Sequence, residues 1–280
     1  MSGQRTLPSP ARLQKLPAQG TVRRTAGSGR LGRYRAPIVG ATAVVLVIVA
    51  WQLAVVLELV DVSFIAEPTA IGEELVRLFT SGVIFEDLAT SGIELAVGLG
   101  LAAVVGIGLG LIIGWYRLAD EFFEPLVTSL YATPQVALVP VLILWFGIGI
   151  GSKIAVVFLM AVFEILVNTR AGVRTVEENV MRAARSFGAT DRQLVRTIVL
   201  PSAVPFIATG LRLGVGKGLV GVVVGELFAA KAGVGFRLTT AAANLQMTQM
   251  YATLVIIAAV GVALTLLLKR VERHFDAWRV

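Results

Sequence analysis

Five ionisable side chains lie inside long apolar stretches of this 280-residue chain, and they are its first candidates for chemistry: Glu94, Glu164, Arg212, Lys217 and Glu226. A charge at the centre of a bilayer costs about 2.5–3.5 kcal/mol, so such side chains face protein or water and not lipid. Two interpretations stay open. Glu94, Arg212 and Glu226 are partly hydrated ends of their stretches, or the five residues form a candidate translocation path for a hydrophilic solute.

Other kinds of site are poorly supported by the composition. The chain has no cysteine and a single histidine, His274, so it lacks the residues of thiol catalysis, disulfides and Cys- or His-based metal centres. It also lacks the Gly-x-x-x-x-Gly-Lys-Ser/Thr loop with which proteins hold the phosphates of ATP. We therefore expect no enzymatic activity, no catalytic residue, no metal and no cofactor.

The composition predicts an all-α polytopic membrane protein with about six transmembrane helices. Hydrophobic residues make up 56% of the chain, and its mean hydropathy is +0.82. The apolar runs lie near residues 38–57, 89–115, 131–147, 153–169, 203–229 and 250–268. The third and fourth runs are short and meet at a glycine-rich turn, residues 147–151, which predicts a hairpin.

The basic residues predict the orientation in the membrane. Residues 1–36 hold eight basic residues and no acidic one, which predicts a disordered tail. With this tail inside, inner segments hold nineteen basic residues and outer segments four, so both termini are expected in the cytoplasm. The expected domains are this tail, a membrane domain over 37–270 and a cytoplasmic C-terminal tail over 271–280. Helical spacing of the apolar residues in 71–79 predicts a helix on the outer surface.

Small residues recur along two of the apolar runs. The second run carries a small residue every fourth position (Gly98, Ala102, Gly106, Gly110, Gly114), and the fifth run repeats the pattern (Gly210, Gly214, Gly218, Gly221, Gly225). Such stripes let helix backbones approach closely in a membrane. Packing within the chain and packing between subunits both need small residues, so the sequence leaves both open.

A charged segment, residues 175–201, interrupts the apolar runs. Thr175 to Glu178 matches a capping box and predicts a helix from Val176 that ends at Gly188. Residues 190–193 match a second capping box, which predicts another helix from Asp191 to Pro201. We call these two short helices the knob. Membrane runs tether both of its ends, so we reject a DNA-binding helix–turn–helix.

The spacing in the knob resembles the coupling loop, or EAA motif, of ABC-importer permeases. Ala183-Ala184 is followed after three residues by Gly188, and nine residues later by Ile198-x-Leu200-Pro201; Arg182 stands where the family has glutamate. Residues 144–149 and 221–226 are similar to the permeases for nitrate, aliphatic sulfonates and taurine. The resemblance implies the type I ABC-importer permease fold in a bacterial cell membrane, and a small anion as solute.

The resemblance also implies partners. Two ATP-binding cassette ATPase subunits would dock on the knob through Arg182, Ala183, Ala184, Gly188, Ile198, Leu200 and Pro201. A second permease subunit, expected to be an identical copy, would complete the path, and an extracytoplasmic binding protein would deliver the solute. Three alternatives remain: import of another small solute such as a vitamin precursor or bicarbonate, a mechanotransmitting protein that moves no solute, and a secondary transporter. The short chain and the knob argue against the last.

Overall fold

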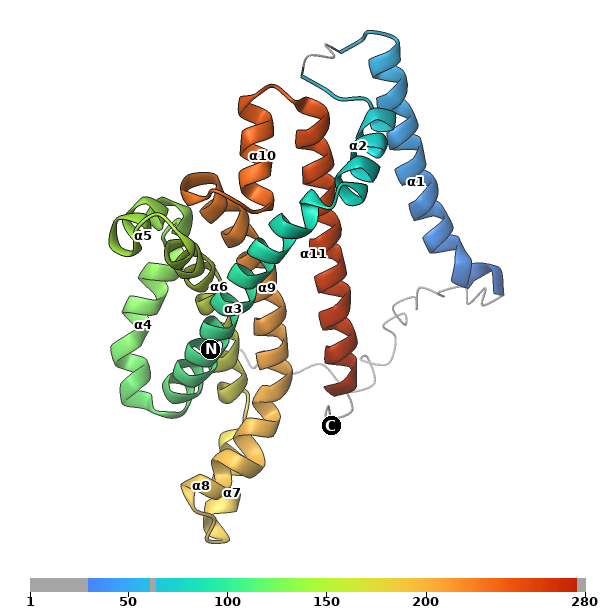
Figure 1. The fold of residues 1–280 in the computed structure, drawn as a ribbon. Helices are drawn as coiled ribbons and strands as arrows, with labels where there is room; N and C mark the ends of the chain where they lie inside the picture. Colours follow the sequence, from blue (N-terminus) through green and yellow to red (C-terminus); the bar gives the residue numbers. More distant parts are fainter. Residues whose placement is uncertain (1–29, 61–63, 276–280) are drawn as a thin grey trace, which may run out of the picture. The chain divides into compact units, whose positions relative to one another are not determined.

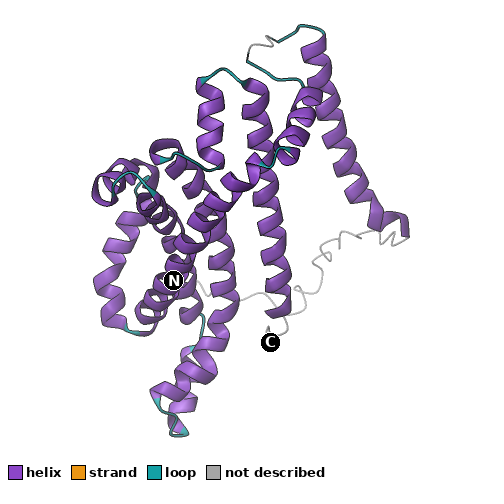
Figure 2. Ribbon diagram, viewed as in Figure 1, coloured by secondary structure: helices purple, strands orange, loops and turns teal. Residues whose placement is uncertain are grey.

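The computed structural model describes residues 30–60 and 64–275, and within them every regular element is a helix (Figure 2). The chain divides into two units, residues 1–50 and residues 51–280, which are described separately. The first helix, α1 (Arg30–Val56), begins inside the tail that the sequence predicted to be disordered. Its apolar side chains from Ile38 to Ala50 are exposed. The rest of that tail, residues 1–29, lies outside the described residues.

The second unit contains the remaining helices (Figure 1). They are α2 (Pro68–Thr80), α3 (Val83–Trp115), α4 (Arg117–Ala132), a 3-10 turn (Gln135–Leu138), α5 (Val139–Phe146), α6 (Ile150–Arg174), α7 (Glu178–Ser186), α8 (Asp191–Leu194), a π turn (Val195–Val199), α9 (Leu200–Ala229), α10 (Val234–Ala243) and α11 (Met247–Phe275). By length and composition, five helical segments of the described chain can cross a membrane, or six if α4 and α5 form one broken span. The predicted all-α membrane fold is confirmed. α11 extends past the predicted boundary at residue 270, and residues 276–280 of that tail lie outside the described chain.

The third apolar run differs from its prediction as a single span near 131–147. α4 and the segment Gln135–Phe146 meet at a bend of 91°. Thr133 is extended because the ring of Pro134 disfavours helical backbone in the residue before it. The predicted hairpin is confirmed: α5 ends at Gly147, which has a positive φ of 76°, and α6 begins at Ile150.

α6 is the central helix of the second unit, and both stripes of small residues pack against it. A Cβ built on Gly98 of α3 would lie 2.7 Å from the side chain of Val157 in α6. A Cβ on Gly110 of α3 would lie 2.6 Å from the side chain of Thr169 in α6. A Cβ on Gly221 of α9 would lie 3.0 Å from the Cα of the same Val157. These contacts confirm that the stripes pack within the chain. The sequence had left open whether they pack within the chain or between subunits.

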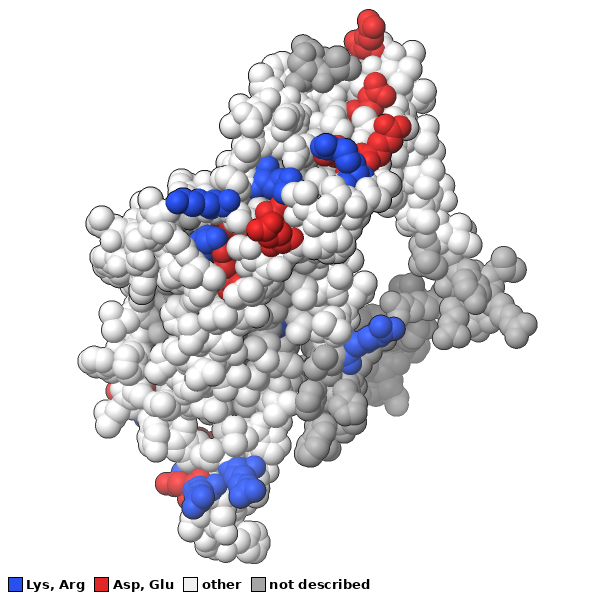
Figure 3. All heavy atoms as spheres, in the orientation of Figure 1, with Lys and Arg blue, Asp and Glu red and all other residues white. Residues whose placement is uncertain are grey.

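Charged side chains gather at the two ends of the second unit. In Figure 1 the knob helices α7 and α8 project at one end, and α2 and α10 lie at the other. We call these the knob end and the opposite end. The face shown in Figure 3 carries charges around both ends and a broad, mostly uncharged band between them. The helix predicted over 71–79 is α2, whose buried Ile71 and Leu78 pack with Ala252 and Ile256 of α11.

Candidate functional site

The knob consists of two short helices that reverse direction at Gly188, as predicted. Gly188 has a φ of 84°, a conformation that costs non-glycine residues about 1–2 kcal/mol. Its N–H donates to the carbonyl of Arg185 at 2.9 Å, and the N–H of Ala189 donates to that of Ala184 at 3.1 Å. The predicted second capping box is confirmed, because Thr190 and Gln193 exchange side-chain and backbone hydrogen bonds.

The first predicted capping box is wrong. α7 begins at Glu178 instead of Val176, and its N-cap residue, Glu177, makes no side-chain capping bond. The Thr175 hydroxyl instead donates to the carbonyl of Gly172 at 2.7 Å. Thr175 therefore stabilises the C-terminal end of α6 and does not cap α7. The sequence pattern alone could not distinguish these two roles of a threonine between two helices.

Pro201 does not end the second knob helix, contrary to the prediction. Helical backbone runs through α8, the π turn and α9, a stretch of 38 residues from Asp191 to Phe228. Proline has no N–H to donate, and its ring crowds the carbonyl four residues earlier. The wider π turn at Val195–Val199 ends two residues before Pro201 and accommodates this crowding. The knob is thus continuous with the membrane-spanning α9.

The predicted coupling residues of the knob differ in their exposure to solvent. Arg182, Ala183 and Gly188 are exposed, whereas the others are partly buried (Ala184, Ile198, Leu200, Pro201). The sequence missed Phe187 as a site residue, although its ring is 92% exposed at the tip. At the base of the knob, Met181 packs against Val199 and Ala203. The tip therefore presents an unpacked aromatic ring on a rigid turn.

At the opposite end, three polar side chains hold the first backbone N–H groups of α10. Asp87 of α3 accepts from Gly233 at 3.0 Å, Ser91 of α3 accepts from Val234 at 3.0 Å, and Glu226 of α9 accepts from Gly235 at 2.6 Å. The Ser91 hydroxyl also donates to Glu226 at 2.6 Å, and Arg237 pairs with Asp87. The N-terminal N–H groups of a helix lack partners within it, so these side chains anchor α10 to α3 and α9.

Glu94 lies beneath this anchor and pairs with Lys153 of α6. Glu94 and Glu226 are 0% and 1% exposed, so the interpretation of these two as hydrated ends is wrong. Lys153, one of the four basic residues that the sequence analysis counts in the outer segments, is also buried, at 5% exposure. In this structure both carboxylates join helices together, and neither faces an open surface.

The other candidate path residues lie apart from this anchor. The carboxylate of Glu164 in α6 lies 4.0 Å from the ammonium group of Lys217 in α9. It also accepts a 3.4 Å hydrogen bond from the hydroxyl of Tyr131 in α4. Glu164 is nearly buried, whereas 54% of the Lys217 side chain is exposed. Arg212 is partly buried in α9. Four of the five predicted path residues thus fall into two groups: Glu94 and Glu226 at a closed anchor, and Glu164 and Lys217 in an open charged pair.

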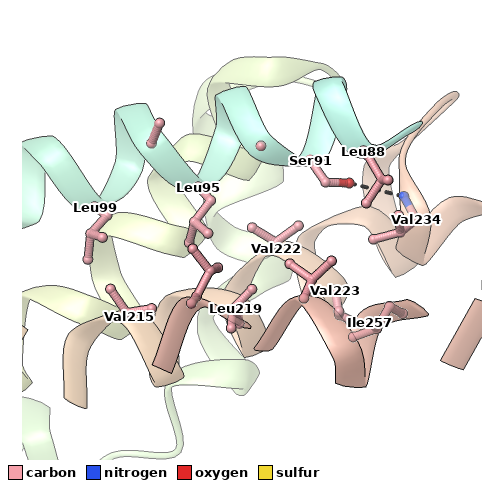
Figure 4. Close-up of a pocket in the computed structure, with 14 residues that line it drawn as sticks. Leu88, Ser91, Leu95, Leu99, Val215, Leu219, Val222, Val223, Val234 and Ile257 are labelled. Carbon is pink, nitrogen blue, oxygen red and sulfur yellow. Dashed lines mark hydrogen bonds between the residues drawn. The ribbon is translucent and has the colours of Figure 1, made fainter. Parts of the chain in front are cut away.

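A cavity of about 360 Å³ between α3, α9, α10 and α11 offers no alternative place for a hydrophilic solute (Figure 4). Its walls are apolar side chains such as Leu95, Leu219 and Val222, together with Ser91. The Ser91 hydroxyl already donates one hydrogen bond and accepts another. A charged solute in this cavity would lose its hydration without gaining a partner.

An ionic cluster joins α4 to α6 towards the knob end, and sequence reasoning missed it. Asp120 of α4 is buried, at 5% exposure. It pairs with Arg174 and, at 2.6 Å, with Arg170 of α6. The sequence had treated both arginines only as markers of orientation. The cluster lies outside the apolar runs, so no periodicity pointed to it.

Comparison with known proteins places these features in a family. Residues 106–279 match the family described as "binding-protein-dependent transport system inner membrane component". The chain is 30% identical to the taurine transport system permease protein TauC of Escherichia coli, over 86% of this chain and 88% of that protein. It is also 30% identical to a putative aliphatic sulfonates transport permease protein, SsuC of Bacillus subtilis, over 92% of each.

The fold is also found among solved structures. A chain of the inward-facing MetNI methionine ABC transporter superposes with a TM-score of 0.61 over 69% of this chain and 96% of that one, at 17% identity. Together with the membrane-spanning helices and the knob, these matches show that the chain belongs to the binding-protein-dependent transport system inner membrane components, the permease subunits of ABC importers.

Proposed function

We propose that the knob binds an ATPase subunit and passes its movement to a solute path along α9. The observation that carries this proposal is the uninterrupted helical backbone from Asp191 in the knob to Phe228 near the opposite end. A helix transmits displacement along its axis because its backbone hydrogen bonds resist bending. The knob end is then the cytoplasmic end, with both chain termini on that side.

The path follows the face of α9 that carries Lys217. Leu213, Gly216, Lys217 and Val220 are exposed and lie along one side of this helix. Lipid contact with this face would leave a lysine ammonium in hydrocarbon, at a cost of about 2.5–3.5 kcal/mol. A second copy of the chain covers this face across a water-lined path, and an extracytoplasmic binding protein delivers the solute at the opposite end. The solute is a small organic acid of the class for which the relatives are named, which are taurine and aliphatic sulfonates.

Phe187 gives the most selective test of ATPase docking. In proteoliposomes that contain the permease, the ATPase and the binding protein, Phe187→Ala is expected to lower ATP-driven uptake at least tenfold. It is also expected to release the ATPase during purification. Buried aromatic anchors in interfaces contribute about 2 kcal/mol or more, which is more than tenfold in affinity. Phe122→Ala is the matched control, because that phenylalanine is 69% exposed on α4 and is not part of the knob.

Equal uptake and equal ATPase retention in wild type, Phe187→Ala and Phe122→Ala would show that the tip of the knob does not bind the ATPase. ATP hydrolysis without uptake in the wild-type complex would instead favour the mechanotransmitting alternative.

A further inference from the structure

The ion pair between Glu164 and Lys217 is built differently from the ion pair at the opposite end. The Glu94 and Lys153 side chains are 0% and 6% exposed, and that pair is closed on all sides. Glu164 and Lys217 are 11% and 54% exposed, and their charged atoms are 4.0 Å apart. An ion pair in a protein interior offsets the lost hydration of its two charges only when they are close, so a long pair adds little to the joining of helices.

The Glu164 carboxylate makes only long contacts within the described part of the chain. The Tyr131 hydroxyl lies 3.4 and 3.5 Å from its two oxygens, whereas hydroxyl hydrogen bonds are usually about 2.5–3.0 Å. Its other charged contact is the 4.0 Å approach of Lys217. A nearly buried carboxylate in this position has capacity for a closer cationic partner.

Open space lies beside the pair. A Cβ built on Gly216 would have no atom within 4 Å, and Leu213 and Val220 on the same side of α9 are 44% and 48% exposed. Glu164 and Lys217 lie well inside α6 and α9, far from either helix end. A solute that moves along this face therefore passes between a carboxylate and an ammonium group.

On the basis of the proposed function, we propose that Glu164 and Lys217 form a subsite for a small zwitterion. The ammonium group of the solute lies against Glu164 and the Tyr131 hydroxyl, and its acid group lies against Lys217. The half-exposed lysine side chain swings away from Glu164 to admit the solute. Each of the two charged side chains then gains an opposite partner, and the net charge of the site does not change. A solute with an acid group alone would place its negative charge beside Glu164.

Ligand-observed saturation-transfer NMR on the permease–ATPase complex in nanodiscs tests this subsite without a binding protein. Three probes share one two-carbon skeleton: 2-aminoethanesulfonate has both charges, ethanesulfonate has the negative one and ethylamine has the positive one. We expect the wild-type complex to bind 2-aminoethanesulfonate at least fivefold more tightly than either singly charged probe. Glu164→Gln should abolish the preference over ethanesulfonate, and Lys217→Met the preference over ethylamine.

Two further variants separate a lost subsite from a damaged complex. Glu164→Asp keeps the charge and should retain at least a twofold preference for the zwitterion. Glu121→Gln removes a carboxylate that is 58% exposed on α4 and should leave all three affinities unchanged. Equal affinities of the wild-type complex for the three probes, or an unchanged zwitterion preference in Glu164→Gln, would overturn the subsite.

Uptake by the same protein in proteoliposomes with the ATPase and the binding protein distinguishes the subsite from the function on which it rests. ATP-driven uptake with no zwitterion preference would overturn the subsite and leave the importer function standing. A zwitterion preference that disappears in Glu164→Gln, in a complex that shows no ATP-driven uptake, would establish the subsite and overturn the proposed function.

Discussion

At the residue scale, the sequence shows which charged side chains lie in the apolar runs, but it does not show which residues they pair with. The five charges in the apolar runs were identified correctly, yet nothing in their spacing showed that Glu94 pairs with Lys153 or that Glu226 caps α10. These partners lie more than fifty residues away or in a separate short helix. Hydrophobic periodicity reports on the face of one helix, whereas such pairing depends on how helices meet.

Gly188 gives the residue-scale prediction for the knob. Gly188→Val should lower ATPase retention and ATP-driven uptake at least fivefold, because a β-branched residue is strained at a φ of 84° by about 1–2 kcal/mol. Gly188→Asn is the control, since asparagine tolerates this conformation better than other residues, and it should keep most of the activity. Normal uptake and ATPase retention in Gly188→Val would mean that the turn does not position the docking surface.

At the element scale, the membrane helices and the hairpin were predictable, and the irregular joints were not. Long apolar runs locate α3, α6, α9 and α11 within a few residues. The π turn before Pro201 and the 91° bend between α4 and α5 each follow from a proline whose effect depends on neighbouring structure. A proline ends a helix in one context and is absorbed by a wider turn in another, so the sequence predicted a break where the helix continues.

The anchor of α10 gives the element-scale prediction. Glu226→Gln should raise hydrogen exchange at the amides of Gly233, Val234 and Gly235 about tenfold or more, because a hydrogen bond to a charged group contributes about 1.5–3 kcal/mol. Its amide also presents a donor where the carboxylate accepts from both Ser91 and Gly235. Uptake should fall while the assembly with the ATPase stays intact.

Glu86→Gln serves as the comparison for this prediction, since Glu86 is exposed on the same helix, α3, as Asp87 and Ser91. Exchange that rises equally in both variants, or in neither, would show that the Glu226 carboxylate does not hold α10.

At the scale of the whole molecule, the glycine stripes of α3 and α9 both pack against α6, so these three helices form one tightly packed group. The knob is continuous with α9, and α10 is anchored to α3 and α9. On the proposed function, displacement of the knob is expected to move the Lys217 face and α10 together. The stripes indicated close packing from the sequence, but only the contacts with α6 show which helices pack together.

If nucleotide bound by the ATPase on the knob changes which side of the membrane reaches the Lys217 face, one labelling measurement shows it directly. The chain has no cysteine, and a side chain at Gly216 would meet open space, so Gly216→Cys reports on this face alone. Ala252→Cys, at a fully buried position, is the unreactive control. In sided vesicles, a membrane-impermeant thiol reagent should label Gly216→Cys from the knob end without nucleotide and from the opposite end with ATP bound. Labelling that is the same from both sides, and unchanged by ATP, would contradict the account.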